Sequence, residues 1–371
     1  FPLATPFVDY DYTFAPAVAG GQLSLRTSLY SIHRRTSYTP FAGVHQARHQ
    51  TRLSSELTWQ RRMVSAAGLV ASPFVDLRGD VFVTRDLPDP AVPGGLREAE
   101  TTARLLPAAG LDLRWPWMRT DGLGRHVISP VAQIIAARDE PDEERIGNED
   151  SIALDFSAQR LFLHDRFSGR DRYEGGVRAN VGLLYSLYMP RGGFLRASIG
   201  QSYHLSGNNS FTMGSGLASD RSDLVSAVAF EPADWLRLSW QGRFDYASLS
   251  LRDQVVSASI SHALGSLRMD YARLAAAPAY GRPAREEQIF GQAAINLTGR
   301  WQLFGSWRYD LARTYTIQRS IGVGFECDCM SLRLTYQENN ESEADVISGH
   351  SILLSVEFKT LGTGRIGTGT F

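Results

Sequence analysis

The sequence predicts an all-β protein, an antiparallel transmembrane β-barrel, and three observations support this. Apolar and polar residues alternate with period two along much of the 371-residue chain, which is the pattern of strands with one apolar and one polar face. Many alternating segments are ten residues or longer, whereas strands of soluble proteins average about five or six residues. Full charges stand in the middle of the polar faces, as a wet barrel lumen allows.

The clearest alternating segments define the predicted strands. In 177–189 the odd positions are apolar from Val177 to Met189, and Arg178 stands between them. In 235–246 one face carries Leu238 and the other carries Arg237. The same pattern holds in 51–64, 289–297, 301–311, 315–325 and 352–358. Aromatic residues stand near segment ends, as interfacial girdles of a barrel do: Tyr30, Trp59, Trp115, Trp117, Tyr188, Trp235, Tyr246, Trp301 and Tyr309.

The connections between these segments alternate between short and long. Short turns lie at 119–122, 190–193, 231–234, 298–300 and 326–328. Long connections lie at 34–50, 86–106, 138–174, 205–220, 276–285 and 338–349. In outer-membrane barrels short turns are periplasmic and long loops extracellular, and the count here is about 17 strands, the last at 351–361.

The strand count bears on the domain organisation. An odd number places Phe1 at the extracellular side, whereas bacterial single-chain barrels have an even number of strands. The start of the chain also lacks the basic and apolar regions of a signal peptide. We therefore expect residues 1–371 to form the C-terminal part of a larger outer-membrane barrel, with its first strands absent.

Composition excludes several classes of protein. The formal net charge is -1, so no basic excess points to a nucleic-acid partner. Two cysteines cannot form a disulfide framework in a chain of this length. No apolar stretch approaches the length of a membrane-spanning helix. The basic residues are nearly all arginine, with Lys359 the single lysine, and arginine is suited to bidentate phosphate recognition.

Several strings in the middle and at the end of the chain carry a family resemblance. They lie at 114–118 (RWPWM), 126–133 (HVISPVAQ), 148–151 (NEDS), 165–180 (DRFSGRDRYEGGVRAN), 325–329 (FECDC) and 351–359 (SILLSVEFK). Together they resemble the C-terminal barrel region of LptD, also called OstA, the lipopolysaccharide (LPS) assembly protein, in its alphaproteobacterial form. The resemblance covers essentially the whole chain, and the string at 165–178 is its most specific part.

This resemblance implies a function and a set of partners. The family is a translocon of the Gram-negative outer membrane that assembles LPS into the outer leaflet, with no enzymatic activity and no cofactor. Its barrel encloses a plug lipoprotein (LptE-like) and follows an N-terminal periplasmic jellyroll, which this chain lacks and which meets a periplasmic LPS-bridge protein. Arginines of the lumen would hold the phosphorylated head group by charge-assisted hydrogen bonds, while the acyl chains leave sideways into lipid.

The resemblance also implies roles for particular residues. Sideways exit requires a seam at the last strand, whose alternating residues are Ile352, Leu354, Val356 and Phe358. The arginines expected to face the lumen are Arg178, Arg237, Arg243, Arg308 and Arg333. Cys327 and Cys329 flank a turn expected in the oxidising periplasm. In the family, two cysteines at this place form disulfides with the N-terminal domain; here Asp328 separates them, and free thiols are the alternative.

Two further segments leave alternatives open. The connection 138–174 is long enough to fold into the lumen and cap it, and it has apolar residues of its own: Ile152, Leu154, Phe156, Leu161, Phe162 and Leu163. Its acidic run from Asp139 to Asp150 is either a solvated loop or a cation site. The motif at 362–367 (GTGRIG) matches a dinucleotide fingerprint, but no room for a helix follows, so a flexible tail is expected.

Three other functions compete with the translocon. A porin or a plugged receptor barrel would share the alternating strands. An outer-membrane enzyme would need a nucleophile and a base in hydrogen-bond reach, and the spacing of the eight histidines suggests no such pair. A soluble β-protein would fold in buffer without detergent.

Overall fold

The computed structural model describes residues 2–15, 17–41, 44–89, 91–92, 94–141, 143–152, 155–341, 348–359 and 362–367. Within these residues, 20 strands form one antiparallel sheet, and four short strands form two separate hairpins. The predicted all-β antiparallel fold is confirmed. No helix in the described part of the chain is long and apolar enough to cross a membrane.

The strands of the large sheet follow one another along the chain. They are β1 (Leu3–Thr13), β2 (Gln22–His33), β5 (His49–Gln60), β6 (Met63–Val64), β7 (Val70–Arg85), β10 (Glu100–Arg114), β11 (Trp117–Asp121), β12 (Gly124–Ala137), β13 (Gly176–Tyr188), β14 (Phe194–Ser206), β15 (Leu224–Ala233), β16 (Leu236–Phe244), β17 (Leu251–His262), β18 (Gly265–Leu274), β19 (Glu286–Asn296), β20 (Trp301–Asp310), β21 (Tyr315–Glu326), β22 (Met330–Asn339), β23 (Gly349–Phe358) and β24 (Gly362–Gly367). All seven clearest alternating segments coincide with strands of this sheet.

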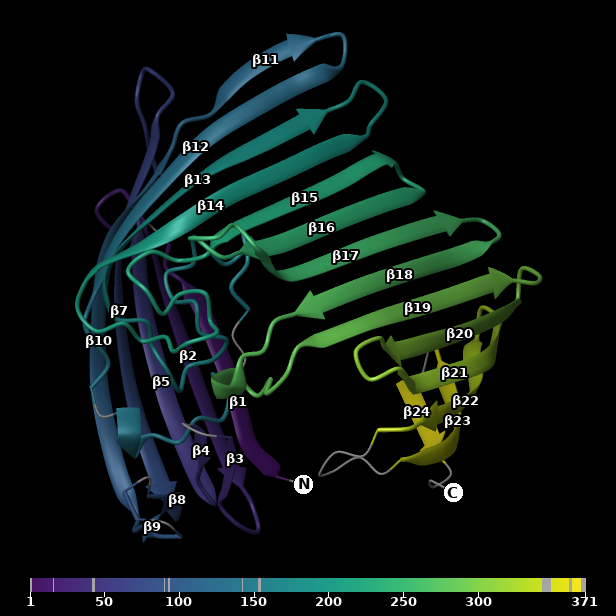
Figure 1. The fold of residues 1–371 in the computed structure, drawn as a ribbon, viewed down its shortest axis with the longest axis horizontal. Coiled ribbons are helices and arrows are strands. Elements are labelled where there is room, and N and C mark those ends of the chain that lie inside the picture. The colour runs from purple at the N-terminus through teal and green to yellow at the C-terminus, as the bar shows by residue number, and fades with distance from the viewer. Residues whose placement is uncertain are drawn as a thin grey trace.

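The long connections carry the remaining elements. The hairpin of β3 (Tyr38–Phe41) and β4 (Val44–Gln46) lies between β2 and β5, and that of β8 (Leu87–Pro88) and β9 (Leu96–Arg97) lies between β7 and β10. Two single-turn 3-10 helices, η1 (Glu143–Arg145) and η2 (Pro278–Tyr280), lie in later connections. Figure 1 shows the sheet curving around a space that holds the connection between β12 and β13.

The strand register separates the two faces of the sheet. Residues directly opposite each other in an antiparallel pair share a face. Through these pairs the inner, concave face carries polar side chains such as Gln133, Asn180 and Ser202, which are aligned across β12, β13 and β14. The convex face carries large apolar side chains that stay exposed, for example Leu183 (43%) and Ile321 (56%). A continuous exposed apolar face is what a lipid-facing surface requires.

Two sequence expectations are wrong at the end of the sheet. The expected flexible tail at 362–367 is a further strand, β24, which pairs in antiparallel register with β23. The glycines of this segment can pair because the hydrogen bonds between strands use only backbone groups. Since glycine has no side chain, the segment does not show the alternation of apolar and polar residues that marks the other strands. The strand expected to be last, β23, therefore has a neighbour on both sides; its expected end at Thr360 and Leu361 lies outside the described residues.

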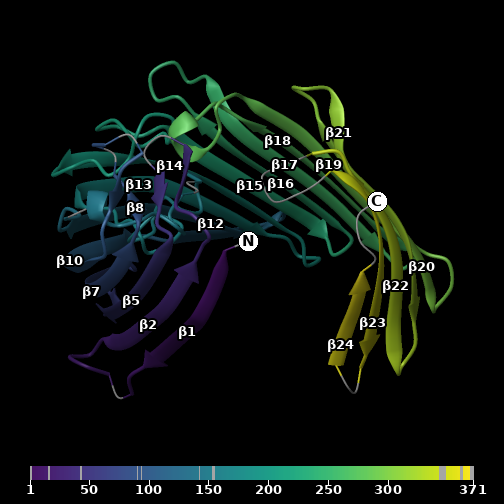
Figure 2. The same cartoon turned by 90° about the horizontal axis from the view of Figure 1, so that it is seen from below.

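The extra strand also affects the predicted count. About 17 strands are expected, and the structure adds β24 to them. In two places one crossing of the sheet is made by two consecutive strands, β5 with β6 and β10 with β11. Because β24 makes the number of crossings even, the odd-number argument for a missing first part no longer holds. Figure 2 shows β1 and β24 at the two ends of the curved sheet, and no strand pairing joins them in the described residues.

Candidate functional site

The candidate site is the concave face where it meets the β12–β13 connection, residues 138–175, which we call the inner loop. Of this loop the structure describes all residues except Asp142, Ala153 and Leu154. It was predicted to fold into the space enclosed by the sheet, and the structure confirms that it packs on the concave face (Figure 1).

Four arginines of the sheet form the wall beneath the inner loop. Arg52 of β5, Arg78 of β7, Arg104 of β10 and Arg178 of β13 are each at most 5% exposed. Each stands on the polar face of its strand because polar positions alternate with apolar ones. Buried cations are costly unless they are paired, so this wall requires carboxylates from the segment that covers it.

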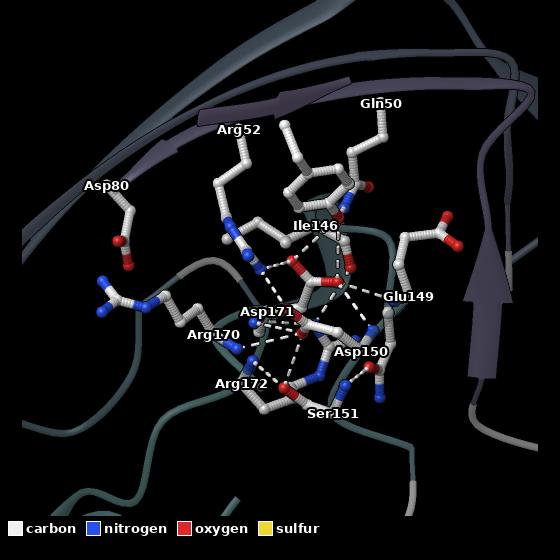
Figure 3. A network of polar contacts seen from close by, with 12 residues as sticks. Gln50, Arg52, Asp80, Ile146, Glu149, Asp150, Ser151, Arg170, Asp171 and Arg172 are labelled. Carbon is white, nitrogen blue, oxygen red and sulfur yellow. Dashed lines mark hydrogen bonds and ion pairs between the residues drawn. The ribbon is translucent and has the colours of Figure 1, made fainter. Parts of the chain in front are cut away.

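Two aspartates of the inner loop supply carboxylates to Arg52 (Figure 3). Its Nη1 donates hydrogen bonds to Asp171 Oδ1 at 2.6 Å and to Asp150 Oδ2 at 2.7 Å. The amides of Glu149 and Asp150 donate to Asp171 Oδ2 at 2.7 and 3.2 Å. The amides of Arg170 and Asp171 donate to Asp150 Oδ1, both at 3.0 Å. The two carboxylates thus hold two distant parts of the loop together and fasten both to the wall.

The other wall arginines are paired in the same way. Arg104 Nε donates to Asp80 Oδ2 of the neighbouring strand at 2.7 Å, and its Nη1 donates to Glu140 of the inner loop. Arg78 also bonds Asp80, and it donates to the backbone carbonyl of Arg170. The inner loop is therefore attached to strands whose residues are far from it in sequence.

The acidic run of the inner loop has a structural role. Glu140 accepts a hydrogen bond from Arg104, and Asp150 accepts one from Arg52. Glu149 forms a bidentate ion pair with Arg34, in which one of the two bonds is 2.8 Å long. The expectation of a solvated loop is wrong for these residues, since their carboxylates point at arginines. No group of three metal-ligating side chains occurs in the described residues; Asp142 lies outside them.

A histidine forms a second attachment. His164 Nδ1 lies 2.9 Å from Asp76 Oδ2, its Nε2 lies 3.8 Å from Asp112 Oδ2, and its ring stacks on Phe74 with centroids 3.6 Å apart. Burial alone would lower the pKa of His164, but the carboxylates of Asp112 and Asp76 raise it to about 9. The imidazole is thus mainly protonated at neutral pH, and it lies between Asp76 of β7 and Asp112 of β10.

The string at 165–178 forms its own ion cluster. Glu174 accepts a bond of 2.8 Å from Arg166 Nε and lies 3.3 Å from Arg178 Nε. Burial raises the pKa of Glu174, but the guanidinium groups of Arg166 and Arg178 hold it below its usual value. Arg178 also donates to the carbonyl of His164. The string is therefore a compact charge-matched unit between the loop and β13.

Apolar contacts complete the seat of the inner loop. The β14–β15 connection folds over the inner loop and shares a small core with it, made of Phe156, Leu161, Phe211, Leu217 and Val225. The predicted apolar residues of the loop include two of this core; Leu154 lies outside the described residues.

All five predicted lumen arginines stand on the concave face by strand register, although only two are covered. Arg178 and Arg243 are buried under loops, 1% and 5% exposed. Arg237 shares the face of Arg243 along β16. Ser239 lies on the same face of β16, and its successive cross-strand partners are Ser257, Asp270, Phe290 and then Arg308. Gln302 shares the face of Arg308 along β20, and its successive partners are Gly324 and then Arg333. That this face lines a barrel lumen remains a prediction.

Sequence reasoning missed three of the four wall arginines. Arg52, Arg78 and Arg104 lie on alternating strands just as Arg178 does, so their position on a polar face could have been found. Their partners could not, because Asp150, Asp171 and Glu140 are brought to them only by the folding of the inner loop.

The remaining predicted residues lie away from the inner loop. Cys327 and Cys329 occupy the turn between β21 and β22 as free thiols, with the Sγ atoms 2.7 Å apart. Ile352, Leu354, Val356 and Phe358 alternate along β23. Because β24 pairs with β23, these residues do not form the edge of the sheet.

The chain is similar to proteins of known families. A family model, LptD: LPS transport system D, matches residues 1–307. The LPS-assembly protein LptD of Nitrosococcus oceani is 26% identical over 311 residues, 80% of this chain and 39% of that protein. The LPS-assembly protein LptD of Idiomarina loihiensis is 27% identical over 271 residues, 70% of this chain and 35% of that protein. The chain therefore spans little more than a third of the length of these relatives.

Solved structures of outer-membrane proteins are more distantly similar. The copper transporter OprC aligns with 94% of this chain and 64% of its own, at 14% identity and a TM-score of 0.40. A mutant of the Rh. blastica porin aligns with 98% of this chain and 95% of its own, at 11% identity and a TM-score of 0.33.

Proposed function

The chain belongs to the LptD family of LPS transport proteins in the outer membrane, and from this premise we propose that its sheet is part of the barrel wall along which LPS passes to the outer leaflet. The concave face carries the polar head group, and the convex face is in contact with lipid. The observation that carries this proposal is the division of one sheet into an arginine-bearing concave face and an exposed apolar convex face.

The chemistry of the concave face suits this substrate. LPS has phosphorylated sugars, and guanidinium groups bind phosphate by charge-assisted, often bidentate bonds. Arg237 and Arg268 stand on neighbouring positions of this face, joined through Ser259, and both side chains are more than half exposed. Each forms an ion pair, Arg237 with Glu231 and Arg268 with Asp270. Because exposed pairs of this kind contribute little, a passing phosphate can replace the carboxylate partner, whereas the wall arginines are buried under the inner loop.

The finer parts of the proposal concern segments and partners outside this chain. We infer that a longer protein supplies the first barrel strands and a periplasmic jellyroll, and that an LptE-like plug lipoprotein and a periplasmic LPS-bridge protein are its partners. The family resemblance supports these inferences. The proposed seam lies at the β24 end of the sheet, with β23 behind it. The proposed role is transport, without a catalytic step or a cofactor.

Site-specific photo-crosslinking tests this function. A photoreactive residue at Ser259, on the concave face beside Arg237, is expected to capture LPS in cells that synthesise it. The matched control is Ile260, the next residue, whose side chain points to the convex face near a short turn. There we expect adducts with phospholipid. Absence of LPS adducts at Ser259, with the protein folded and inserted, contradicts the proposal.

A further inference from the structure

A pocket outside the wall network lies between the inner loop, β16–β17 and the connection that carries η2. Its volume is about 400 Å³, within the range of about 300–1,000 Å³ that is usual for small-ligand sites. It adjoins three of the long connections. These lie at the end of the sheet that the expected topology places outside the cell. None of the ion pairs of the wall arginines described above extends into it.

The floor of this pocket is rigid. Arg243 donates to Asp223 at 2.6 Å and to Asp253 at 2.5 Å, and it is 5% exposed. Asp253 also accepts a bond of 2.7 Å from the amide of Ala275, which fixes the η2 connection to β17. Phe156, which forms one side, is held in the shared apolar core. A site whose walls are fixed in advance loses little entropy when a ligand binds.

The pocket is also lined by polar groups that keep hydrogen-bonding capacity for a ligand. Arg160 and Arg282 line it, and within the described residues neither has a carboxylate partner, although Arg160 Nη1 donates to the carbonyl of Arg166 at 3.2 Å. Arg282 is positioned by two backbone hydrogen bonds with Ala277, at 2.7 and 3.1 Å. The Tyr280 hydroxyl accepts a bond from the Thr212 amide at 3.1 Å, which fixes the ring beside the pocket. Asp155 is the exposed carboxylate of the rim.

We propose that this pocket binds an acidic sugar residue, one that carries a carboxylate or a phosphate. Arg160 and Arg282 bind the acid group, Asp155 and Gln241 bind hydroxyls, and the rings of Tyr280 and Phe156 contact the apolar face of the sugar. An acyl chain does not fit these groups, because it would desolvate two arginines without replacing their hydrogen bonds. If the proposed function holds, the ligand is the saccharide part of LPS, held at the outer end of its path.

Direct binding tests the pocket. The probe is the deacylated, phosphorylated oligosaccharide released from LPS by alkali, titrated calorimetrically into the full chain in detergent. The double variant Arg160→Gln with Arg282→Gln is expected to weaken binding at least tenfold, since bonds to charged groups are the strong ones. The matched control is Arg191→Gln, an exposed arginine in the short turn between β13 and β14, at the opposite end of the sheet from the long connections. It is expected to change binding less than twofold.

A second variant and two further probes sharpen the test. Gln241→Trp fills the pocket without changing charge and is expected to abolish binding. The same oligosaccharide after phosphatase treatment and carboxyl reduction is expected to bind at least tenfold more weakly, and laurate is expected not to compete. The proposal is overturned if the double variant or the Gln241→Trp variant binds the oligosaccharide as tightly as the unaltered protein does. It is also overturned if the neutral oligosaccharide binds as tightly as the charged one, or if laurate displaces the charged oligosaccharide.

The outcome is separable from that of the transport proposal. LPS capture at Ser259 together with unchanged oligosaccharide affinity in the double variant rejects the pocket and leaves the transport function standing. Pocket-dependent oligosaccharide binding without LPS capture at Ser259 supports the pocket and rejects the transport function.

Discussion

Asp150 and Asp171 cap each other's backbone across the inner loop, and their carboxylates share one nitrogen atom of Arg52, at 2.7 and 2.6 Å. All four carboxylate oxygens accept hydrogen bonds: one oxygen of each aspartate accepts from Arg52, and the other accepts from two backbone amides. This arrangement explains how this acidic segment can pack against the sheet, since both carboxylates contact the same cation and their remaining oxygens are hydrogen-bonded.

Removal of the shared cation is expected to release the inner loop. Arg52→Met leaves the buried carboxylate of Asp171 and the partly exposed one of Asp150 without their shared cation, and loss of a buried partner costs about 3–5 kcal/mol. The matched control, Arg26→Met, breaks an ion pair with Asp11 whose side chains are both more than 60% exposed, and such pairs contribute about 0–1 kcal/mol. Hydrogen exchange of the amides at 146–152 and 168–174 measures the effect. Equal protection in the two variants contradicts it.

The His164 attachment is expected to weaken at alkaline pH. Its pKa in the folded protein is about 9, above the ordinary value of 6.5, so its contribution is full below pH 6.5 and is lost as the pH rises through 9. Proteolytic cleavage within 155–163 should increase between pH 7.5 and 10. His164→Gln should remove this pH dependence, whereas His204→Gln, at a histidine that contacts the carbonyl of Gly207, should retain it. A pH-independent cleavage rate in the unaltered protein contradicts the prediction.

A side chain at Gly200 is expected to push the inner loop off the sheet. A Cβ atom there would overlap Leu161 of the loop and lie 2.6 Å from the carbonyl oxygen of Val181. Gly200→Val should therefore cost about 1–3 kcal/mol by overpacking. Gly122→Val is the control, because a Cβ at Gly122 has nothing within 4 Å. Thermal unfolding in detergent measures both variants, and a Gly200 variant as stable as the control refutes the contact.

The two faces of β16 are expected to meet different solvents. In a background with Cys327 and Cys329 replaced by serine, Arg237→Cys should react with a water-soluble maleimide. Leu238 is the next residue and lies on the opposite face, with 38% of its surface exposed. Leu238→Cys should therefore react only with a lipid-soluble reagent. Reaction of both positions with the water-soluble reagent would mean that the convex face is not in lipid.

The thiols of the β21–β22 turn are expected to form disulfides with other parts of a longer chain. Cys329 is exposed and Cys327 is partly exposed, and the turn is one of the short ones expected in the oxidising periplasm. Non-reducing mass spectrometry of the full-length protein should link each to a different upstream cysteine. Two free thiols, or a bond between Cys327 and Cys329, would contradict this prediction.

The sequence predicts the strands well and the site only in part, for a physical reason. Strand alternation, as at Arg237 and Leu238, is local, because each residue's face follows from its neighbours. The inner loop was recognisable from its length and its apolar residues. Its partners were not, since Arg52 and Asp171 lie 119 positions apart and only tertiary folding joins them. β24 was missed because its glycines pair through the backbone and leave no pattern of side chains.

The inner loop has a mechanical consequence for the sheet. It is bonded at once to β2 through Tyr30, to β5 through Arg52, to β10 through Arg104 and to β13 through Arg178. It acts as an internal brace, since none of these strands can shear past its neighbour without breaking a buried ion pair or hydrogen bond. The strands from β18 to β24 carry no such brace in the described part of the chain, so any widening of the curve is concentrated in that more compliant half.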